Sequence, residues 1–223
     1  MRLDVDIDKT LTSGARRFQL ALRFQSDAAR TVLFGPSGAG KSLTLRALAG
    51  LVSPDRGRIA VDGQLWFDAA TGVDVPPRRR RVGYLFQDYA LFPHLTVRQN
   101  IAFARTRGLL NPRRAARDAV VDHWLDALEL GPLGALLPSQ ISGGQRQRTA
   151  LARALVTDPV LLLLDEPFSA LDAELRQRTR DELDRLLARI AVPLVMITHD
   201  PDDLKHFGEC VVRLRAGRVE PAL

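Results

Sequence analysis

The stretch Thr31-Val-Leu-Phe-Gly-Pro-Ser-Gly-Ala-Gly-Lys-Ser42 decides the fold of this chain. Its second part fits the phosphate-binding loop pattern G-x-x-x-x-G-K-[ST] with Gly35, Pro36, Ser37, Gly38, Ala39, Gly40, Lys41 and Ser42. A short apolar run leads in, and a helical pattern, 43–49, leads out. Glycines let successive backbone N–H groups surround a phosphate, and the helix N-terminus adds partial positive charge. The sequence therefore predicts a nucleoside triphosphate site, in which Lys41 contacts the β- and γ-phosphates and Ser42 binds Mg²⁺.

An acidic pair, Asp165-Glu166, follows a second apolar run, 160–164. In an open α/β sheet, the carboxyl end of such a strand lies beside the phosphate loop. We therefore expect Asp165 to hold Mg²⁺, mainly through water, and Glu166 to polarise the attacking water as general base. Taken alone, the pair is equally typical of an exposed strand end, and only the phosphate loop favours the catalytic interpretation.

Two further sites follow the same logic. His199 comes after a third apolar run, 194–198, so we expect it at the same sheet edge near the γ-phosphate, with a structural histidine as the alternative. A Ser-Gly-Gly turn opens the helical pattern 146–156 and offers bare N–H groups and a hydroxyl to an anion. A plain helix cap is the alternative for this turn. Its residues are Ser142, Gly143, Gly144 and Gln145.

The order of apolar patterns predicts the fold class. Strict alternation at 3–7 and 18–24 predicts antiparallel strands joined near 12–14, whereas the three continuous runs are typical of parallel strands buried on both faces. Between about 88 and 155 only helical stretches are seen: 97–104, 113–130 and 145–156. We predict a single α/β domain, 1–223, whose nucleotide-binding core (1–87 and 156–223) carries an inserted helical lobe (88–155). The clearest single helix follows Leu171, and the four arginines 78–81 are expected on an exposed turn.

Composition excludes several classes. The 223 residues are 46% hydrophobic and 26% charged, which is typical of a globular domain rather than a disordered or fibrous chain. No apolar run approaches the roughly 20 residues of a membrane span, and no basic-then-apolar leader opens the chain, so export by that route is not expected. One cysteine, Cys210, excludes an internal disulfide and a cysteine-based zinc cluster.

Taken together, the ordered motifs resemble those of the ATP-binding subunits of ATP-binding cassette (ABC) transporters over essentially the whole length. They are Gly35–Ser42, Gln87, Ser142–Gln145, Leu161–Glu166, Ser169-Ala-Leu-Asp172 and His199. The resemblance implies the ABC-type phosphate-loop ATPase fold, ATP and Mg²⁺ as cofactors, and hydrolysis to ADP and phosphate. It implies a head-to-tail homodimer in which Lys41 and Ser42 of one copy face Ser142, Gly143 and Gly144 of the other.

Further roles are implied by the same resemblance. Gln87 would join the Mg²⁺ shell and sense a membrane permease, Asp172 would cross the dimer interface, and His199 would complete the γ-phosphate site. Tyr89, Phe92 and His94 lie in the region expected to dock the permease. The subunit would lie on the cytoplasmic face of the plasma membrane and would meet a substrate-binding protein only indirectly.

The segments 65–68, 80–87 and 88–96 look most like importer subunits for small oxyanions, molybdate first and sulfate or thiosulfate next. Those subunits commonly carry an extra C-terminal β-domain, and we expect this chain, which stops soon after Gly217, to lack it. Ile141 stands where the family usually has leucine, a volume-conserving change. The family's adenine-stacking aromatic has no clear counterpart; Phe18 is the nearest candidate, with a core role as the alternative.

Two other functional classes compete with an importer. The net charge of +6 is compatible with an ABC-type ATPase that acts on nucleic acid or ribosomes, although such relatives usually carry coiled coils or paired cassettes, and no nucleic-acid partner is expected. A small-molecule kinase would use the same phosphate loop but would leave Ser142–Gln145 and His199 without a role.

Overall fold

The computed structural model describes the chain except residues 15, 107–110, 114–117, 170, 172, 191 and 221–223, and the side chains of residues 16 and 173–175. The strands are Leu3–Ser13 (β1), Arg16–Ser26 (β2), Arg30–Phe34 (β3), Arg56–Val61 (β4), Gln64–Asp68 (β5), Val73–Asp74 (β6), Val82–Leu85 (β7), Leu161–Asp165 (β8), Leu194–Thr198 (β9), Cys210–Arg215 (β10) and Arg218–Val219 (β11). The α-helices are Lys41–Ala49 (α1), Pro77–Arg80 (α2), Val97–Phe103 (α3), Ala119–Ala127 (α4), Gly143–Leu155 (α5), Ala173–Ile190 (α6) and Pro201–Phe207 (α7). Two 3₁₀ turns, Gly131–Leu133 and Pro138–Gln140, lie between α4 and α5.

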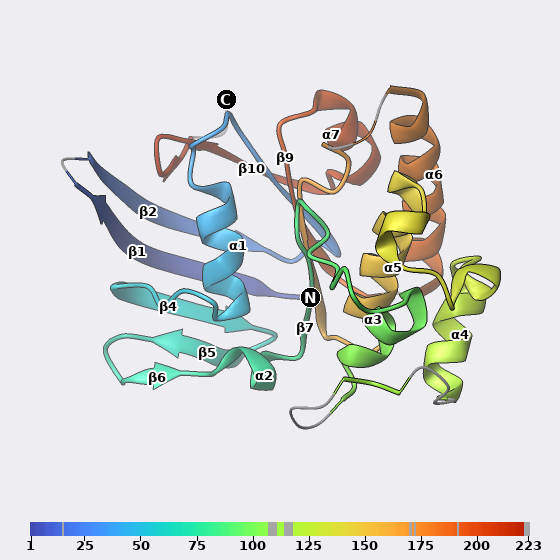
Figure 1. The fold of residues 1–223 in the computed structure, drawn as a ribbon. Helices are drawn as coiled ribbons and strands as arrows, with labels where there is room; N and C mark the ends of the chain where they lie inside the picture. The colour runs from blue at the N-terminus through green and yellow to red at the C-terminus, as the bar shows by residue number, and fades with distance from the viewer. Residues whose placement is uncertain are drawn as a thin grey trace.

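The strands form one continuous sheet that is antiparallel on one side and parallel on the other. Its strand order is β6-β5-β4-β1-β2-β11-β10-β3-β9-β8-β7. The strands β10, β3, β9, β8 and β7 pair in parallel, whereas β2, β1, β4, β5 and β6 pair antiparallel. The predicted fold class, a parallel α/β core with an N-terminal antiparallel part, is therefore confirmed (Figure 1).

The parallel strands separate two hydrophobic cores, which explains their continuous apolar runs. On β8, Leu161 and Leu163 pack toward α1 and the antiparallel strands, while Leu162 and Leu164 pack toward α5, α6 and α7. Successive side chains of a strand point to opposite faces, so a strand covered on both sides needs apolar residues at every position. Val160 is an exception to the predicted run, because it precedes the strand and is exposed.

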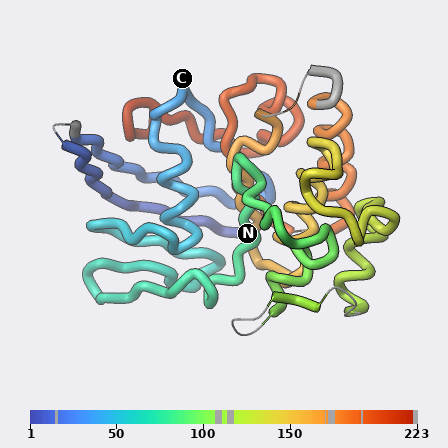
Figure 2. Tube along the Cα trace, in the orientation of Figure 1, coloured from blue at the N-terminus to red at the C-terminus, as the bar shows by residue number. Residues whose placement is uncertain are grey.

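The helices α3, α4 and α5 gather on one side of the parallel strands, with α6 beside α5 (Figures 1 and 2). Each of the three begins at a capped residue: Thr96 and Ser142 form capping boxes, and Asp118 accepts from the Val120 N–H. The helix expected over 113–130 begins only at Ala119, after Asp118, and part of the expected range, 114–117, lies outside the described residues. The division of the chain at residues 88 and 155 stays a prediction.

The expectation of four exposed arginines at 78–81 is wrong for Arg80. This side chain is 1% exposed and donates to the Ala47 and Leu48 carbonyls at the end of α1, at 2.7 and 3.0 Å. It also pairs with Asp74 and lies over the ring of Trp66. The guanidinium replaces the hydrogen bonds that the last carbonyls of a helix lack. Arg80 thereby joins α1 to the β5–β6 hairpin.

Candidate functional site

The loop between β3 and α1 has a backbone that only glycine accommodates at two positions. Gly40 adopts a φ of 99°, and a Cβ there would lie 2.5 Å from Leu20 Cδ1. A Cβ on Gly35 would lie 2.1 Å from the Leu214 carbonyl oxygen of β10. The loop therefore lies tightly against β2 and β10, and α1 begins directly after it with its first N–H groups open to an anion.

Lys41 is folded against this loop. Its ammonium donates to the Gly35 and Pro36 carbonyls at 2.7 and 3.0 Å, and the side chain is only 5% exposed. Burial lowers the pKa of Lys41, while Glu166 and Asp165 oppose that shift. A partly desolvated ammonium held by neutral carbonyls is available to a phosphate oxygen that offers a full negative charge.

Two of the three predicted metal residues, Ser42 and Asp165, lie together. Ser42 donates its hydroxyl to Asp165 at 2.9 Å, which joins the start of α1 to the end of β8. Tyr84 of β7 donates its phenol to the other carboxylate oxygen at 3.2 Å, a contact that sequence reasoning missed. Burial raises the pKa of Asp165 against the effect of these two hydrogen bonds, and burial also raises the pKa of Tyr84. Asp165 is thus a desolvated carboxylate whose charge a cation would stabilise.

Glu166 follows Asp165 and has a positive φ of 46°. Its carboxylate lies 3.8 Å from the Lys41 ammonium and 3.3 Å from His199 Nδ1. A non-glycine residue in this backbone region is uncommon and occurs where the surroundings impose it. Glu166 and His199 come from neighbouring strands β8 and β9, as their positions after two apolar runs predict.

A cavity of about 430 Å³ opens over the phosphate loop. Ser37, Gly38, Gly40, Lys41, Ser42, Gln87 and Glu166 line it, so most of the predicted loop, metal and catalytic residues meet there. Phe18 and its cross-strand neighbour Leu11 form the apolar wall. Phe18 is half-buried and packs against the core while it also lines this cavity, so both the core role and the role beside the nucleotide base stay open. A second, smaller cavity contains His199 and again Glu166, so Glu166 borders both.

The turn Ser142–Gln145 does not line the phosphate-loop cavity. Within one copy it forms a helix cap: the Gln145 N–H donates to the Ser142 hydroxyl at 3.2 Å, and the Gln145 side chain accepts from the Ser142 N–H at 2.8 Å. The alternative interpretation of the turn as a cap therefore describes the isolated chain. Asp172, also predicted to contact a second copy, lies outside the described residues.

The region expected to dock a permease contains a groove of about 710 Å³. Phe86, Phe92 and Phe103 line it together with Arg78, Arg81 and Arg153. Tyr89 is buried under the loop instead of lining the groove, and His94 is exposed beside it. In the described part of the chain, no helix is long and apolar enough to cross a bilayer.

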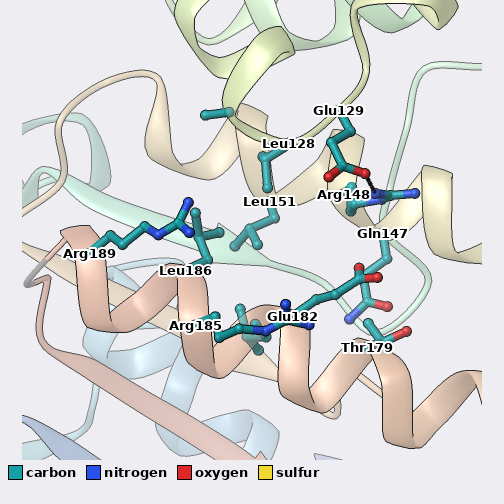
Figure 3. A pocket seen from close by; sticks show the side chains of 12 residues that line it. Leu128, Glu129, Gln147, Arg148, Leu151, Thr179, Glu182, Arg185, Leu186 and Arg189 are labelled. Atoms are coloured by element: carbon teal, nitrogen blue, oxygen red, sulfur yellow. Dashed lines mark hydrogen bonds and ion pairs between the residues drawn. The ribbon is translucent and has the colours of Figure 1, made fainter.

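A separate cavity of about 190 Å³ lies between the end of α4, α5 and α6. Figure 3 shows the side chains that line it. Leu128, Leu151 and Leu186 line its apolar side, and Arg148 pairs with Glu129 at its edge. None of its lining residues lines the phosphate-loop cavity, so it is no part of the nucleotide site.

Comparison with known families identifies the architecture. The model of the ABC transporter family matches residues 20–169, a range that includes the phosphate loop, Ser142–Gln145 and the Asp165–Glu166 pair. The chain belongs to the ABC transporter family. The cassette matches its curated relatives over most of its own length but spans about half of theirs.

Several relatives are import ATP-binding proteins. The cassette is 41% identical over 215 residues to the molybdenum import ATP-binding protein of Rhodospirillum rubrum, covering 96% of the chain and 56% of that protein. It is 45% identical over 194 residues to the sulfate/thiosulfate import ATP-binding protein of Synechocystis, covering 87% and 52%. It is 44% identical over 219 residues to an Fe(3+) ions import ATP-binding protein of Rhodococcus jostii, covering 97% and 60%.

Among solved structures, a dimeric post-hydrolysis state of an ATP-binding cassette bound to ADP and Pi matches with a TM-score of 0.78. Sequence identity is 28%, and the match covers 99% of this chain and 97% of that one. The predicted resemblance and fold class are therefore confirmed.

Proposed function

We propose that this chain is the ATP-hydrolysing subunit of an ABC importer and that it works as a pair of copies on a membrane permease. The observation that carries the proposal is the position of Glu166. Its carboxylate borders the phosphate-loop cavity and lies within 3.8 Å of Lys41 and 3.3 Å of His199. A carboxylate so placed is suited to activate a water at the terminal phosphate.

In the proposed reaction, Lys41 exchanges its loop carbonyls for oxygens of the β- and γ-phosphates. Glu166 accepts a proton from water while the water oxygen attacks the γ-phosphorus. The bond from phosphorus to the bridging oxygen breaks, and ADP and phosphate result. His199 donates a hydrogen bond to the γ-phosphate, and Gln87, which follows β7, lines the phosphate-loop cavity.

The residues present also fit Mg²⁺. The Ser42 hydroxyl and the Asp165 carboxylate are oxygen donors of the kind that this ion prefers, and they lie 2.9 Å apart. The Gln87 side chain lines the phosphate-loop cavity together with Ser42 and would add a third oxygen. When bound, the ion supplies positive charge at the phosphate oxygens, and Tyr84 holds the second oxygen of Asp165 in place.

A head-to-tail pair would complete the site. The turn Ser142–Gln145 begins α5 and contributes nothing to the cavity of its own copy. A second copy would bring its own turn, with the free N–H groups of a helix start, to the γ-phosphate. The match to a dimeric cassette with ADP and Pi supports this arrangement.

The groove lined by Phe86, Phe92 and Phe103 is the proposed permease contact. An aromatic groove that arginines also line suits a short amphipathic segment from a membrane protein. The relatives favour molybdate as the transported ion, with sulfate or thiosulfate as the alternative. Uptake of molybdate and sulfate by vesicles that contain the chain and a co-expressed permease would decide between them.

The experiment that tests the proposal combines phosphate release with size-exclusion chromatography of Glu166→Gln, with and without ATP. The substitution leaves the loop intact but removes the base, so ATP should convert the variant from monomer to stable dimer. Adding Ser142→Arg should abolish this dimer, while Ser139→Arg, at an exposed position three residues earlier, should not. Phosphate release by Glu166→Gln at the unmodified rate would exclude Glu166 as the base.

A further inference from the structure

Side chains of α6 and α7 form hydrogen bonds with the turn that carries His199. Thr198, the last residue of β9, donates its hydroxyl to Asp203, and the Asp200 N–H donates to the same hydroxyl at 3.0 Å. The hydroxyl thus closes the turn around His199. The Asp200 side chain caps α7 by accepting from the Asp202 N–H. His199 itself remains exposed, with Nδ1 toward Glu166.

Arg180 of α6 anchors this turn in the interior. Its guanidinium donates to Asp203 at 2.6 Å and to Asp200 at 2.5 Å, and both Arg180 and Asp203 are at least 96% buried. A buried ion pair of this kind holds geometry, because loss of one partner leaves a desolvated charge. Arg180 therefore fixes where β9 meets α7.

Arg176 lies one helical turn before Arg180 on the same face of α6. It donates to Asp200 at 3.3 Å and, through its other terminal nitrogen, to the Leu171 carbonyl at 3.0 Å. Leu171 belongs to the loop between β8 and α6, the segment that the family resemblance places against a second copy. Arg176 is 34% exposed, so it is not part of the buried anchor. Its two partners both lie on connecting segments, and Arg176 and Asp200 line the small cavity that contains His199.

We propose that Arg176 is a positioning residue for His199 and links it to the Leu171 loop. This inference rests on the proposed function, because the link matters when a second copy contacts that loop. A displacement of the Leu171 backbone moves the Arg176 guanidinium through their hydrogen bond. Arg176 in turn displaces Asp200, the residue after His199, to which it also donates. A displaced Asp200 would move His199 away from Glu166, whose carboxylate lies 3.3 Å from His199 Nδ1. Hydrolysis then depends on the position of the Leu171 loop.

The test compares Arg176→Ala with Arg176→Lys and with Arg185→Ala. Arg185 is an exposed control on the same helix whose guanidinium donates to the Asp181 carbonyl of its own helix. We expect Arg176→Ala to lower kcat on the order of tenfold while the KM for ATP and the melting temperature stay unchanged. Arg176→Lys should restore part of the rate, because lysine keeps one donor, and Arg185→Ala should behave as the unmodified protein.

A double-mutant cycle shows whether the effect passes through His199. In a His199→Ala background, Arg176→Ala should cause no further loss, since coupled residues are not additive. An equal loss in both backgrounds, or an unchanged kcat in Arg176→Ala, would overturn the inference. If the unmodified protein releases no phosphate, the proposed function fails instead.

A measurement without nucleotide distinguishes failure of the Arg176 inference from failure of the proposed ATPase function. NMR signals of the His199 ring in the unliganded chain should shift in Arg176→Ala and stay in place in Arg185→Ala. Unchanged ring signals in Arg176→Ala would refute the link even in a protein without ATPase activity.

Discussion

Arg153 in the last turn of α5 holds the backbone of Tyr89: its guanidinium donates to the Tyr89 and Ala90 carbonyls, each at 2.7 Å. Both residues have positive φ, 63° and 44°, so the arginine stabilises a backbone that side chains rarely adopt. The same helix begins at Ser142. Helix α5 thus has the turn proposed to meet the second copy's nucleotide at its start and the proposed permease groove at its end.

Replacement of Arg153 by alanine should release the loop at 89–92. We expect faster amide hydrogen exchange there and a loss of about 2 kcal/mol in the free energy of unfolding, because two charge-assisted hydrogen bonds disappear. Arg148→Ala is the control, since Arg148 on the same helix pairs with the highly exposed Glu129. Equal exchange rates in the two variants would contradict this role of Arg153.

Arg80→Ala should be among the most destabilising substitutions in the chain. It strips hydrogen bonds from the end of α1 and removes one of two side-chain partners of the exposed Asp74, which keeps its hydrogen bond from Ser53, so we expect a loss of about 3 kcal/mol in urea unfolding. Arg79→Ala, at the exposed neighbouring position, should change the free energy of unfolding by about 0.5 kcal/mol or less. A similar midpoint for both variants would show that the burial of Arg80 contributes little.

Two glycines of the phosphate loop offer a matched comparison. Gly38 and Gly40 both have positive φ, 77° and 99°, but an added Cβ meets open space only at Gly38. Gly38→Ala should therefore cost about 1 kcal/mol of backbone strain. Gly40→Ala adds a clash with Leu20 and Phe18 and should also weaken nucleotide binding, measured by titration calorimetry. Equal affinities in the two variants would rule out steric control at Gly40.

Asp165→Asn should stabilise the unliganded protein near neutral pH and abolish Mg²⁺-dependent hydrolysis. Burial raises the folded-state pKa of Asp165, so the charged carboxylate destabilises the fold at high pH. That penalty is absent below the unfolded pKa of about 3.9 and is complete above the raised folded pKa. The advantage of the variant at pH 7 should shrink on acidification toward pH 4. Thermal unfolding at both pH values measures it, and a gain that persists at pH 4 would contradict the assignment.

Local pattern was sufficient for part of the site. Lys41, Ser42, Asp165 and Glu166 each lie at the end of a recognisable strand or the start of a helix, and parallel strands bring such ends to one edge. Tyr84 escaped prediction because its partner Asp165 is 81 positions away and the pairing exists only through the β7–β8 register. Nothing in the alternation of β7 distinguishes a phenol that donates to a metal-binding carboxylate from an ordinary strand residue.

The phosphate loop and the two kinds of strand could be predicted from residue patterns alone, because each depends on neighbours close in the chain. The tertiary structure alone decided that Arg80 of four consecutive arginines is buried, that Tyr89 lies under its loop, and that Arg176 joins Leu171 to Asp200. A charged side chain becomes buried only where distant segments supply its partners, and this supply depends on how the sheet and helices pack. Patterns that depend on residues close in the chain can therefore be read from the sequence, whereas contacts between distant residues appear only in the folded structure.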